Sequence, residues 1–383
     1  MYIKRTITEQ VADSLKKSPV TAILGARQVG KTTLSKVLIS NIPEAFYIDL
    51  EKPSDRDMLA DPENFFRVYN KRMICLDEIQ LLPEVFPVMR SIIDDDEFDI
   101  RFLITGSASP QLLRQSSETL AGRITFFNLS PIAIYELDHA FPLDRYALRG
   151  GFPLSLLSDQ DEDSFRWREN FITTFLERDL RQFGFNIPPE VIRRLWKLIA
   201  HTNGQVLNYS QFSSTLGLSD MTIRKYVGIL ESTFMLRLLQ PYHLNIRKRL
   251  IKSPKLYIKD AGITNALLNI REFTELFSHP AYGGVWESLC IENIIGKFST
   301  WEPYYYRTST GNELDLILTK GNKRIAVELK TSSTPSVTRG FWQALEDVEA
   351  DRAFIIAQVR QAYPYKNGVW VYPIKEFLKL EDF

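Results

Sequence analysis

The feature that most constrains the fold of this chain is a glycine-rich segment near its start, Gly25-Ala26-Arg27-Gln28-Val29-Gly30-Lys31-Thr32. It matches the complete pattern G-x-x-x-x-G-K-[ST] of a phosphate-binding loop. An apolar run, Val20–Leu24, comes directly before the loop, and a helical pattern over Thr33–Ser40 follows it. A loop of this kind between a buried strand and a helix predicts an α/β fold, a parallel sheet sandwiched by helices.

The spacing of the glycines and the lysine in this loop has a chemical reason. Glycines let the backbone curl, so that several N–H groups point at the same phosphate oxygens, and the following helix directs its positive end at them. Lys31 is then placed to reach the β- and γ-phosphates of ATP, and the Thr32 hydroxyl to hold Mg²⁺. The sequence therefore predicts that residues Gly25 to Thr32, with the adjacent Thr33, bind a nucleotide.

A second motif consists of the apolar run Met73–Leu76 followed by Asp77 and Glu78. In a P-loop protein, an aspartate at the end of such a strand holds Mg²⁺. Glu78 is suited to polarise the attacking water as a general base. The alternative is a solvated acidic pair at a strand end. The adjacent glutamate favours ATPases that insert an extra strand between the loop strand and the acidic strand, over GTPases and small kinases.

The segment Arg101 to Ser107 predicts another strand that ends in polar residues. Thr105 and Ser107 are both candidates for a sensor of the γ-phosphate. The alternative is a strand-to-helix turn in which Ser107 or Ser109 caps a helix.

Arg123 precedes an expected strand over Ile124–Leu129. An arginine near the γ-phosphate stabilises the charge that develops in the transition state, so Arg123 is a catalytic candidate. A structural salt bridge is the alternative.

Composition shifts along the chain predict three domains, residues 1–155, 156–272 and 273–383. The first alternates strands and helices, with a further strand over Ala45–Ile48. The second is mostly helical with one short hairpin. The third predicts a helix, three strands, a helix and one or two strands. The Pro- and Gly-containing segment Phe273–Gly284 is expected to be the loop that joins the last two domains.

The middle domain contains a helix-turn-helix pattern, with helices over Tyr209–Leu216 and Met221–Ser232 and a strand over Phe234–Gln240, as in a winged helix. If the second helix reads DNA, Thr222, Arg224 and Lys225 would face the major groove. Alternatively, the module is a lid or packs on a partner protein. A basic run follows, and its default interpretation is a solvated face; its members are Arg247, Lys248, Arg249, Lys252, Lys255 and Lys259.

Two strand patterns of the third domain, Glu313–Leu318 and Arg324–Lys330, carry acidic residues among apolar ones. Residues two apart share a face of a strand, so Glu328 and Lys330 project together and Asp315 can meet them from the neighbouring strand. Carboxylates bind Mg²⁺, and Glu287 on the preceding helix could add a third ligand. Lys330 would orient or deprotonate a water. The order of elements resembles the PD-(D/E)xK restriction-endonuclease-like fold, with Leu314 where the motif has proline.

The chain as a whole resembles a predicted AAA-type ATPase family of bacteria and archaea, which is similar to signalling ATPases that carry a winged-helix lid. The resemblance favours the lid interpretation of the middle domain and gives no settled biological role. The residues that carry it are Tyr2-Ile3-Lys4-Arg5, the phosphate-binding loop, Leu76-Asp77-Glu78-Ile79-Gln80, Thr105-Gly106-Ser107, Gly122-Arg123, Glu177-Arg178-Asp179-Leu180, Trp286-Glu287 and Tyr306-Arg307-Thr308 with Gly311.

Composition narrows the remaining function classes. Lys+Arg and Asp+Glu balance at 47 each, so any nucleic-acid surface is local. Two cysteines give no disulfide framework, which fits a reducing cytoplasm, and no apolar run is long enough to predict a membrane span. Four scattered histidines argue against a zinc site.

These patterns predict an ATP-binding protein, an Mg²⁺-dependent ATPase whose nucleotide state controls a C-terminal nuclease-like domain that acts on or binds DNA. One alternative is a regulatory ATPase with a catalytically silent C-terminal domain. Another is an ATP-dependent DNA-binding regulator that uses the winged helix. A homo-oligomer or a protein partner is left open.

Overall fold

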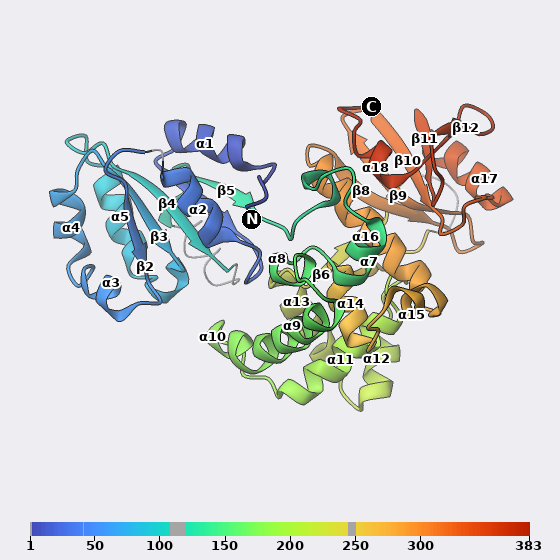
Figure 1. Cartoon of the computed structure of the whole chain (residues 1–383), viewed down its shortest axis with the longest axis horizontal. Coiled ribbons are helices and arrows are strands. Elements are labelled where there is room, and N and C mark those ends of the chain that lie inside the picture. Colours follow the sequence, from blue (N-terminus) through green and yellow to red (C-terminus); the bar gives the residue numbers. More distant parts are fainter. Residues whose placement is uncertain (1, 41, 108–118, 244–249) are drawn as a thin grey trace. The chain divides into compact units, whose positions relative to one another are not determined.

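The computed structural model describes residues 2–40, 42–107, 119–243 and 250–383 (Figure 1). The chain divides into two compact units. Unit 1 consists of Met1–Ile132 and Ser232–Phe234, and unit 2 of Ala133–Glu231 and Met235–Phe383. The division into three domains, with a boundary near residue 272, stays a prediction.

Unit 1 contains a five-stranded sheet in the order β2-β3-β4-β1-β5, and all its strand pairs are parallel. Because β4 lies between the loop strand β1 and the acidic strand β3, the predicted extra strand is confirmed. The strands are β1 (Val20–Leu24), β2 (Phe46–Asp49), β3 (Met73–Asp77), β4 (Arg101–Gly106) and β5 (Ile124–Asn128).

Helices cover this sheet, as expected of parallel strands that are buried on both faces. Every residue of β1 and β3 is buried. One core cluster joins β3 and β4 to α4 and α5, with Phe66, Phe86 and Met89 packed against the strands. The helices of unit 1 are α1 (Thr8–Lys17), α2 (Lys31–Ile39), α3 (Pro53–Asp57), α4 (Pro62–Val68), the 3₁₀ turn η1 (Ile79–Leu81) and α5 (Val85–Ile93).

The register of the strands determines where the functional residues gather. Leu24 pairs with Gly106, and Leu76 with Ile104, so β1, β3 and β4 end at the same edge of the sheet. The ends of these strands and the segments that follow them contain the phosphate-binding loop, the acidic pair and Ser107. In open parallel sheets ligands bind outside the carboxyl ends of the strands, so this edge is the candidate site.

The first part of unit 2 is helical, and it contains the predicted helix-turn-helix pattern. The first helix is confirmed at Tyr209–Leu216, and the second begins one residue earlier than predicted, at Asp220. The turn is reached through Gly217, whose φ of 66° is in the left-handed region. The strand that follows, β6 (Leu236–Leu239), pairs antiparallel with β7 (Lys255–Ile258). Assignment of the module as a winged helix stays a prediction.

The elements of this part include a short π-helical segment, η3 (Phe175–Asp179). The others are η2 (Ile134–Glu136), α7 (Leu143–Arg149), α8 (Pro153–Leu156), α9 (Asp161–Thr174), α10 (Leu180–Gln182), α11 (Pro189–His201), α12 (Tyr209–Leu216), α13 (Asp220–Ser232), β6 (Leu236–Leu239), β7 (Lys255–Ile258), α14 (Ala261–Leu267) and α15 (Phe273–Ser278).

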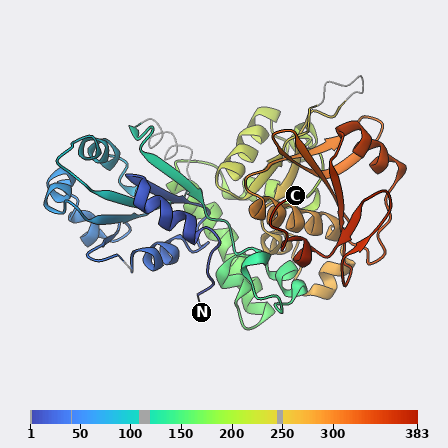
Figure 2. The same ribbon diagram turned by 90° about the horizontal axis from the view of Figure 1, so that it is seen from above.

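The rest of unit 2 is a helix followed by a mixed sheet, whose strands are orange to red in Figure 2. The sheet has six strands in the order β12-β13-β11-β10-β9-β8. The predicted order of helix, three strands, helix and further strands is confirmed, although three strands follow the second helix where one or two were predicted. The predicted joining loop is wrong, because α15 and the start of α16 occupy most of Phe273–Gly284. The elements are α16 (Tyr282–Lys297), β8 (Glu302–Arg307), β9 (Glu313–Lys320), β10 (Lys323–Leu329), α17 (Arg339–Val348), β11 (Arg352–Ile356), β12 (Tyr363–Pro364), β13 (Trp370–Tyr372) and α18 (Ile374–Phe377).

Candidate functional site

The phosphate-binding loop connects β1 to α2 and depends on its glycines for its shape. A Cβ atom at Gly25 would lie 2.3 Å from the carbonyl oxygen of Leu129, so a side chain there would force the loop away from the end of β5. Gly30 has a φ of 99°, which residues with a Cβ rarely adopt. Gln28 also has a positive φ, of 63°. The backbone is therefore curled, as the motif predicts.

Lys31 is the first residue of α2 and is buried. Its Nζ donates to the carbonyl oxygens of Gly25, at 3.2 Å, and Ala26, at 2.9 Å. The ammonium thus lies over the loop itself. Thr33, in the same helical turn, is exposed, and Arg27 lies 3.8 Å from the carboxylate of Glu51.

Asp77 is the centre of the hydrogen bonds at this edge of the sheet, and it is only 2% exposed. Its Oδ2 accepts from the Thr32 hydroxyl at 2.7 Å and from the Tyr47 hydroxyl at 2.5 Å. Its Oδ1 accepts from the hydroxyl of Thr105. The structure thus brings together three residues predicted from separate segments, and Tyr47 is a fourth that the sequence analysis missed.

Tyr47 lies on β2, whose last residue pairs in register with Asp77. Burial raises the pKa of the Tyr47 phenol above its ordinary value, and the hydrogen bond to Asp77 raises it further. The phenol therefore stays a neutral donor. The signal that could have found it is the strand order, because a strand beside β3 brings its end to the acidic pair.

Glu78 follows Asp77 with φ 59° and ψ 48°, a left-handed conformation that is uncommon for residues other than glycine. Its side chain accepts a hydrogen bond from the amide of Gln80, which also donates to the Ser107 hydroxyl at 3.1 Å. The other amide atom of Gln80, Oε1, is buried and makes no hydrogen bond. Glu78 is thus held by Gln80, a residue to which the sequence analysis assigned no role.

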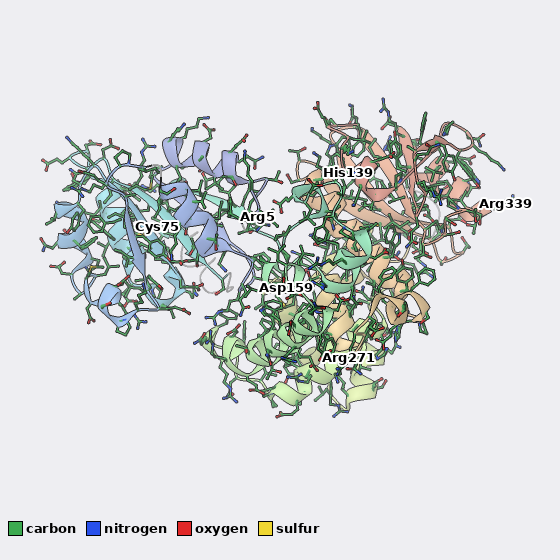
Figure 3. All side chains as sticks on the ribbon, in the orientation of Figure 1. Arg5, Cys75, His139, Asp159, Arg271 and Arg339 are labelled. Carbon is green, nitrogen blue, oxygen red and sulfur yellow. The ribbon has the colours of Figure 1, made fainter. Side chains whose placement is uncertain are left out.

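Arg5 fastens the phosphate-binding loop from outside the motif, and it too was missed (Figure 3). This guanidinium is 6% exposed and donates to the Val29 carbonyl at 3.0 Å. It also donates to the carbonyls of Ser130, at 2.6 Å, and Pro131, at 3.2 Å. It therefore joins the loop to the segment after β5.

Arg123 does not lie with these residues. It directly precedes β5, and the first residue of β5 pairs with Val20 at the beginning of β1, whereas the loop follows the end of β1. Its guanidinium binds Asp94 with N–O distances of 2.5 and 2.9 Å. The prediction that Arg123 lies beside the γ-phosphate of its own chain is therefore wrong, and its salt-bridge alternative is confirmed. The alternative cap Ser109 lies outside the described residues.

A second group of charged residues lies in unit 2, where the nuclease-like site was predicted. We call Glu287, Glu313 and Asp315 the acidic cluster. The ammonium of Lys255 lies among them, 3.0 Å from Glu287, 2.8 Å from Glu313 and 3.3 Å from Asp315. Tyr257 donates its hydroxyl to Glu287 at 2.5 Å. Lys255 was predicted to be part of a solvated basic face, and that prediction is wrong, because it is 3% exposed.

Glu328 and Lys330 form an ion pair of 2.6 Å next to this cluster. Burial and, to a smaller extent, the Asp315 carboxylate raise the pKa of Glu328 to about 8. Burial also raises the pKa of Glu287 to about 7, although Lys255 acts in the opposite direction. Burial lowers the pKa of Lys255, but Glu287 and Asp315 outweigh it and hold that pKa well above its usual range.

The predicted metal ligands of unit 2 are therefore close together, but lysine ammonium groups already compensate their negative charge. Among the residues that the structure describes, no group of three or more His, Cys, Asp or Glu side chains is arranged to hold a metal ion. As a correction to the prediction, the cation among Glu287 and Asp315 is the ammonium of Lys255, and Glu328 is paired with Lys330. Of the predicted basic run, residues 247–249 lie outside the described residues.

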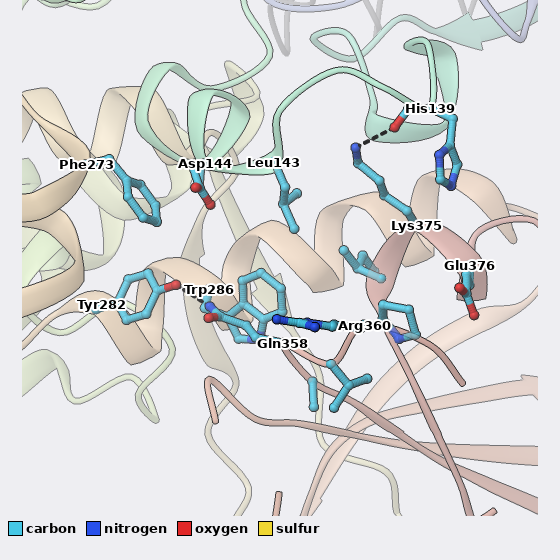
Figure 4. Close-up of a pocket in the computed structure, with 15 residues that line it drawn as sticks. His139, Leu143, Asp144, Phe273, Tyr282, Trp286, Gln358, Arg360, Lys375 and Glu376 are labelled. Atoms are coloured by element: carbon cyan, nitrogen blue, oxygen red, sulfur yellow. Dashed lines mark hydrogen bonds between the residues drawn. The ribbon is translucent and has the colours of Figure 1, made fainter. Parts of the chain in front are cut away.

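Unit 2 also contains a cavity of about 320 Å³ that no sequence motif predicted (Figure 4). Aromatic side chains of Phe273, Tyr282 and Trp286 line one part of it. At another part, Lys375 donates to the carbonyl of His139 at 2.8 Å. Trp286 precedes Glu287 on α16, so one helix contributes to both the cavity and the acidic cluster.

In the described part of the chain, no helix is both long and apolar enough to cross a membrane. Three stretches of the sequence match known families. Residues 17–137 match the family described as AAA domain. Residues 141–274 and 282–377 each match a domain of unknown function, DUF8612 and DUF4143.

Relatives of similar length are themselves without an assigned function. An uncharacterised protein of Mycobacterium tuberculosis is 36% identical over 375 residues, which are 98% of this chain and 84% of that protein. An uncharacterised protein of Haemophilus influenzae is 23% identical over 296 residues, 68% of this chain and 71% of that protein. Among solved structures, the Walker-type ATPase of Pyrococcus abyssi superposes with a TM-score of 0.50 at 14% identity, over 70% of this chain and 96% of that one. That likeness shows the P-loop NTPase fold.

Proposed function

We propose that this chain, which belongs to the family of the uncharacterised mycobacterial protein, binds ATP with Mg²⁺ and hydrolyses it in unit 1. The observation that carries the proposal is the convergence of the curled loop, Lys31, Thr32 and Asp77 at one edge of a parallel sheet. The sequence match to the AAA domain covers this region.

The residues present fit a nucleotide and its metal. The loop backbone and the N-terminal end of α2 provide N–H groups for phosphate oxygens. The Nζ of Lys31 donates to two backbone carbonyls, and the charged oxygens of a triphosphate are stronger acceptors than these. Thr32 and Asp77 present oxygens 2.7 Å apart, the hard ligands that Mg²⁺ prefers. Magnesium bound there would neutralise charge on the phosphates.

Glu78 is the residue that would take the proton of the attacking water. Its carboxylate is held by Gln80, which is in turn bound to Ser107. Thr105 binds Asp77 and accepts from the backbone N–H of Glu78 at 3.4 Å. For hydrolysis, the Glu78 carboxylate must give up its hydrogen bond from Gln80 and accept one from the attacking water. Thr105 keeps Asp77 and Glu78 in position meanwhile.

The test is to measure binding and turnover separately. Calorimetric titration with a non-hydrolysable ATP analogue and Mg²⁺ should show binding by the wild type and by Glu78→Gln, because that glutamate contacts water rather than nucleotide. Glu78→Gln should hydrolyse ATP about 10²- to 10³-fold more slowly, since the general base is lost. Lys31→Ala is the matched control and should fail to bind. Wild-type protein that releases no heat, or a fully active Glu78→Gln, would overturn the proposal.

A second candidate function concerns unit 2, as a nuclease-like domain that acts on DNA under control of the nucleotide state of unit 1. The observation that favours it is that Glu287, Asp315, Glu328 and Lys330 come together on α16, β9 and β10 and just after β10. These are the residue types of metal-assisted phosphodiester cleavage. Linear and branched DNA, incubated with ATP and Mg²⁺ or Mn²⁺, should be cut by the wild type and spared by Asp315→Ala and Lys330→Ala. Absence of such cutting would remove this candidate and leave the ATPase proposal intact.

A further inference from the structure

The ammonium of Lys255 is buried and lies within ion-pair distance of three carboxylates. Its three carboxylate partners come from two different elements, Glu287 from α16 and Glu313 and Asp315 from β9. Lys255 itself is the first residue of β7, in the helical part of the unit. A lysine from one part of the unit thus supplies the positive charge for acids on two other elements.

Backbone hydrogen bonds fix the strand that carries this lysine. The carbonyl of Leu256 accepts from the N–H of Gly204 at 2.8 Å, and the N–H of Leu256 donates to the carbonyl of Gln205 at 3.0 Å. In addition, β7 pairs with β6. A Cβ atom on Gly204 would lie 3.3 Å from the Glu287 carboxylate, so the same turn also approaches the acidic cluster closely. The ammonium is therefore held at the acids by the fold, unlike the end of a surface lysine, which moves freely.

The distances show that Lys255 takes the oxygens that a metal would use. Mg²⁺ needs carboxylate oxygens at about 2.0–2.1 Å in octahedral geometry. The ammonium lies 2.8 to 3.3 Å from one oxygen of each member of the acidic cluster. A metal cannot enter the same space, and the repulsion between two cations in a buried site would oppose it.

The cluster would nevertheless suit a divalent cation if the lysine were absent. The other oxygen of Asp315 is already oriented by the N–H of Leu329 at 2.9 Å. Glu328 is 8% exposed, and its Oε2 is buried and makes no hydrogen bond. Without Lys255, three carboxylates would remain, compensated in part by the Arg307 guanidinium, 3.6 Å from Glu313, and by the ammonium of Lys330, which is paired with Glu328. Such an excess of buried negative charge favours a bound cation.

We propose that the ammonium of Lys255 occupies the position in unit 2 that a divalent cation would otherwise take. Glu287, Glu313 and Asp315 then bind such a cation only when this lysine is removed or withdrawn. The proposal deepens the second candidate function and rests on it for its consequence, which is that β7 must shift before unit 2 can cut DNA. In the conformation described here, the site is closed to metal.

The experiment compares Mn²⁺ binding by the full chain without nucleotide, measured by electron paramagnetic resonance of free Mn²⁺. Lys255→Met keeps the length of the side chain and removes its charge. Lys252→Met, at an exposed lysine three residues earlier, is the matched control. We expect Lys255→Met to bind Mn²⁺ at least about tenfold more tightly than the wild type and Lys252→Met, because an obstructing charge has gone. The double variant Lys255→Met/Asp315→Asn should lose the gain.

Two outcomes would overturn the proposal. One is wild-type protein that binds Mn²⁺ as tightly as Lys255→Met and loses it on Asp315→Asn. The other is a folded Lys255→Met that gains no site. If Lys255→Met does not fold, Mn²⁺ should restore its tryptophan fluorescence, and failure to do so would count equally against the proposal. ATP turnover is not the readout, so failure here leaves the ATPase proposal standing. A gain of metal without any DNA cutting would contradict only the second candidate function.

Discussion

The two charged sites of this chain use lysine and carboxylate in opposite ways. In unit 1, the partners of Asp77 are the hydroxyls of Thr32, Tyr47 and Thr105, while Lys31 donates to backbone carbonyls. In unit 2, the ammonium of Lys255 donates directly to carboxylates. Both lysines are buried, at 4% and 3% exposure, so depth does not distinguish them.

The difference shows that the partners of an acid, rather than the number of acids, decide what it can bind. Hydroxyl donors orient the Asp77 carboxylate and leave its charge in place, so it still attracts a cation. An ammonium such as that of Lys255 orients a carboxylate and also neutralises its negative charge. Unit 1 therefore offers one acid ready for a metal, whereas unit 2 has more acids that are already compensated.

The two sites should differ most in how much each lysine contributes to the folding stability of its unit. Lys255→Met should lower the free energy of unfolding of unit 2 by about 3–5 kcal/mol, because buried carboxylates lose their partner. Lys31→Met should cost unit 1 only about 1 kcal/mol, since backbone carbonyls lose one donor. All six tryptophans lie between Trp167 and Trp370, within unit 2, so urea unfolding followed by tryptophan fluorescence reports on that unit alone.

Circular dichroism in the same titration follows both units and gives the Lys31→Met value. Lys31→Met should leave the fluorescence transition where it is in the wild type. Equal losses from the two substitutions, each in its own unit, would show that the compensation seen around Lys255 adds nothing to stability.

A smaller effect is expected on the pH dependence of the stability of unit 2. Glu328 ionises near its ordinary pKa of 4.5 in the unfolded chain, whereas burial, with Asp315 nearby, raises that pKa to about 8 in the folded unit. The folded state therefore binds more protons between these values. The free energy of unfolding is highest below pH 4.5 and falls as the pH rises towards 8, with a slope of at most about 1.4 kcal/mol per pH unit from this group.

Glu328→Gln should flatten this decline, as measured by tryptophan fluorescence during urea unfolding between pH 5 and pH 8. The exposed Glu381→Gln is the matched control and should keep the wild-type slope. Glu287, whose pKa burial raises to about 7, contributes a decline of the same sign, so some slope remains in Glu328→Gln. A Glu328→Gln slope identical to that of the wild type would mean that Glu328 is ionised in the folded unit.

Local patterns were enough to predict the strands of unit 1 and the residues that gather at the carboxyl edge of its sheet. Each of its strands is four to six residues long and rich in apolar residues, and the glycines of the loop motif determine the backbone of the loop. The position of Arg123 could also have been deduced, because it precedes its strand whereas the loop follows one, and parallel strands place these at opposite edges. Strand direction alone therefore excludes Arg123 from the edge of the sheet where the loop lies.

Contacts between distant segments could not be predicted in the same way. Lys255 and Asp315 are 60 residues apart, and a lysine in a basic run has the same local signature whether it is buried or solvated. Glu313 belongs to an alternating strand whose charged face was recognised, but its partner was not. Arg5 lies 125 residues from Ser130, and its role depends on where the chain leaves the sheet.

Arg5 has a mechanical consequence for unit 1. Because one guanidinium donates to Val29 and also to Ser130 and Pro131, a displacement of the loop is transmitted to the chain at the other side of the same side chain. Residues 130 and 131 are among the last of unit 1 before Ala133 begins unit 2. The arginine thus ties the segment by which the chain leaves unit 1 to the backbone of the phosphate-binding loop.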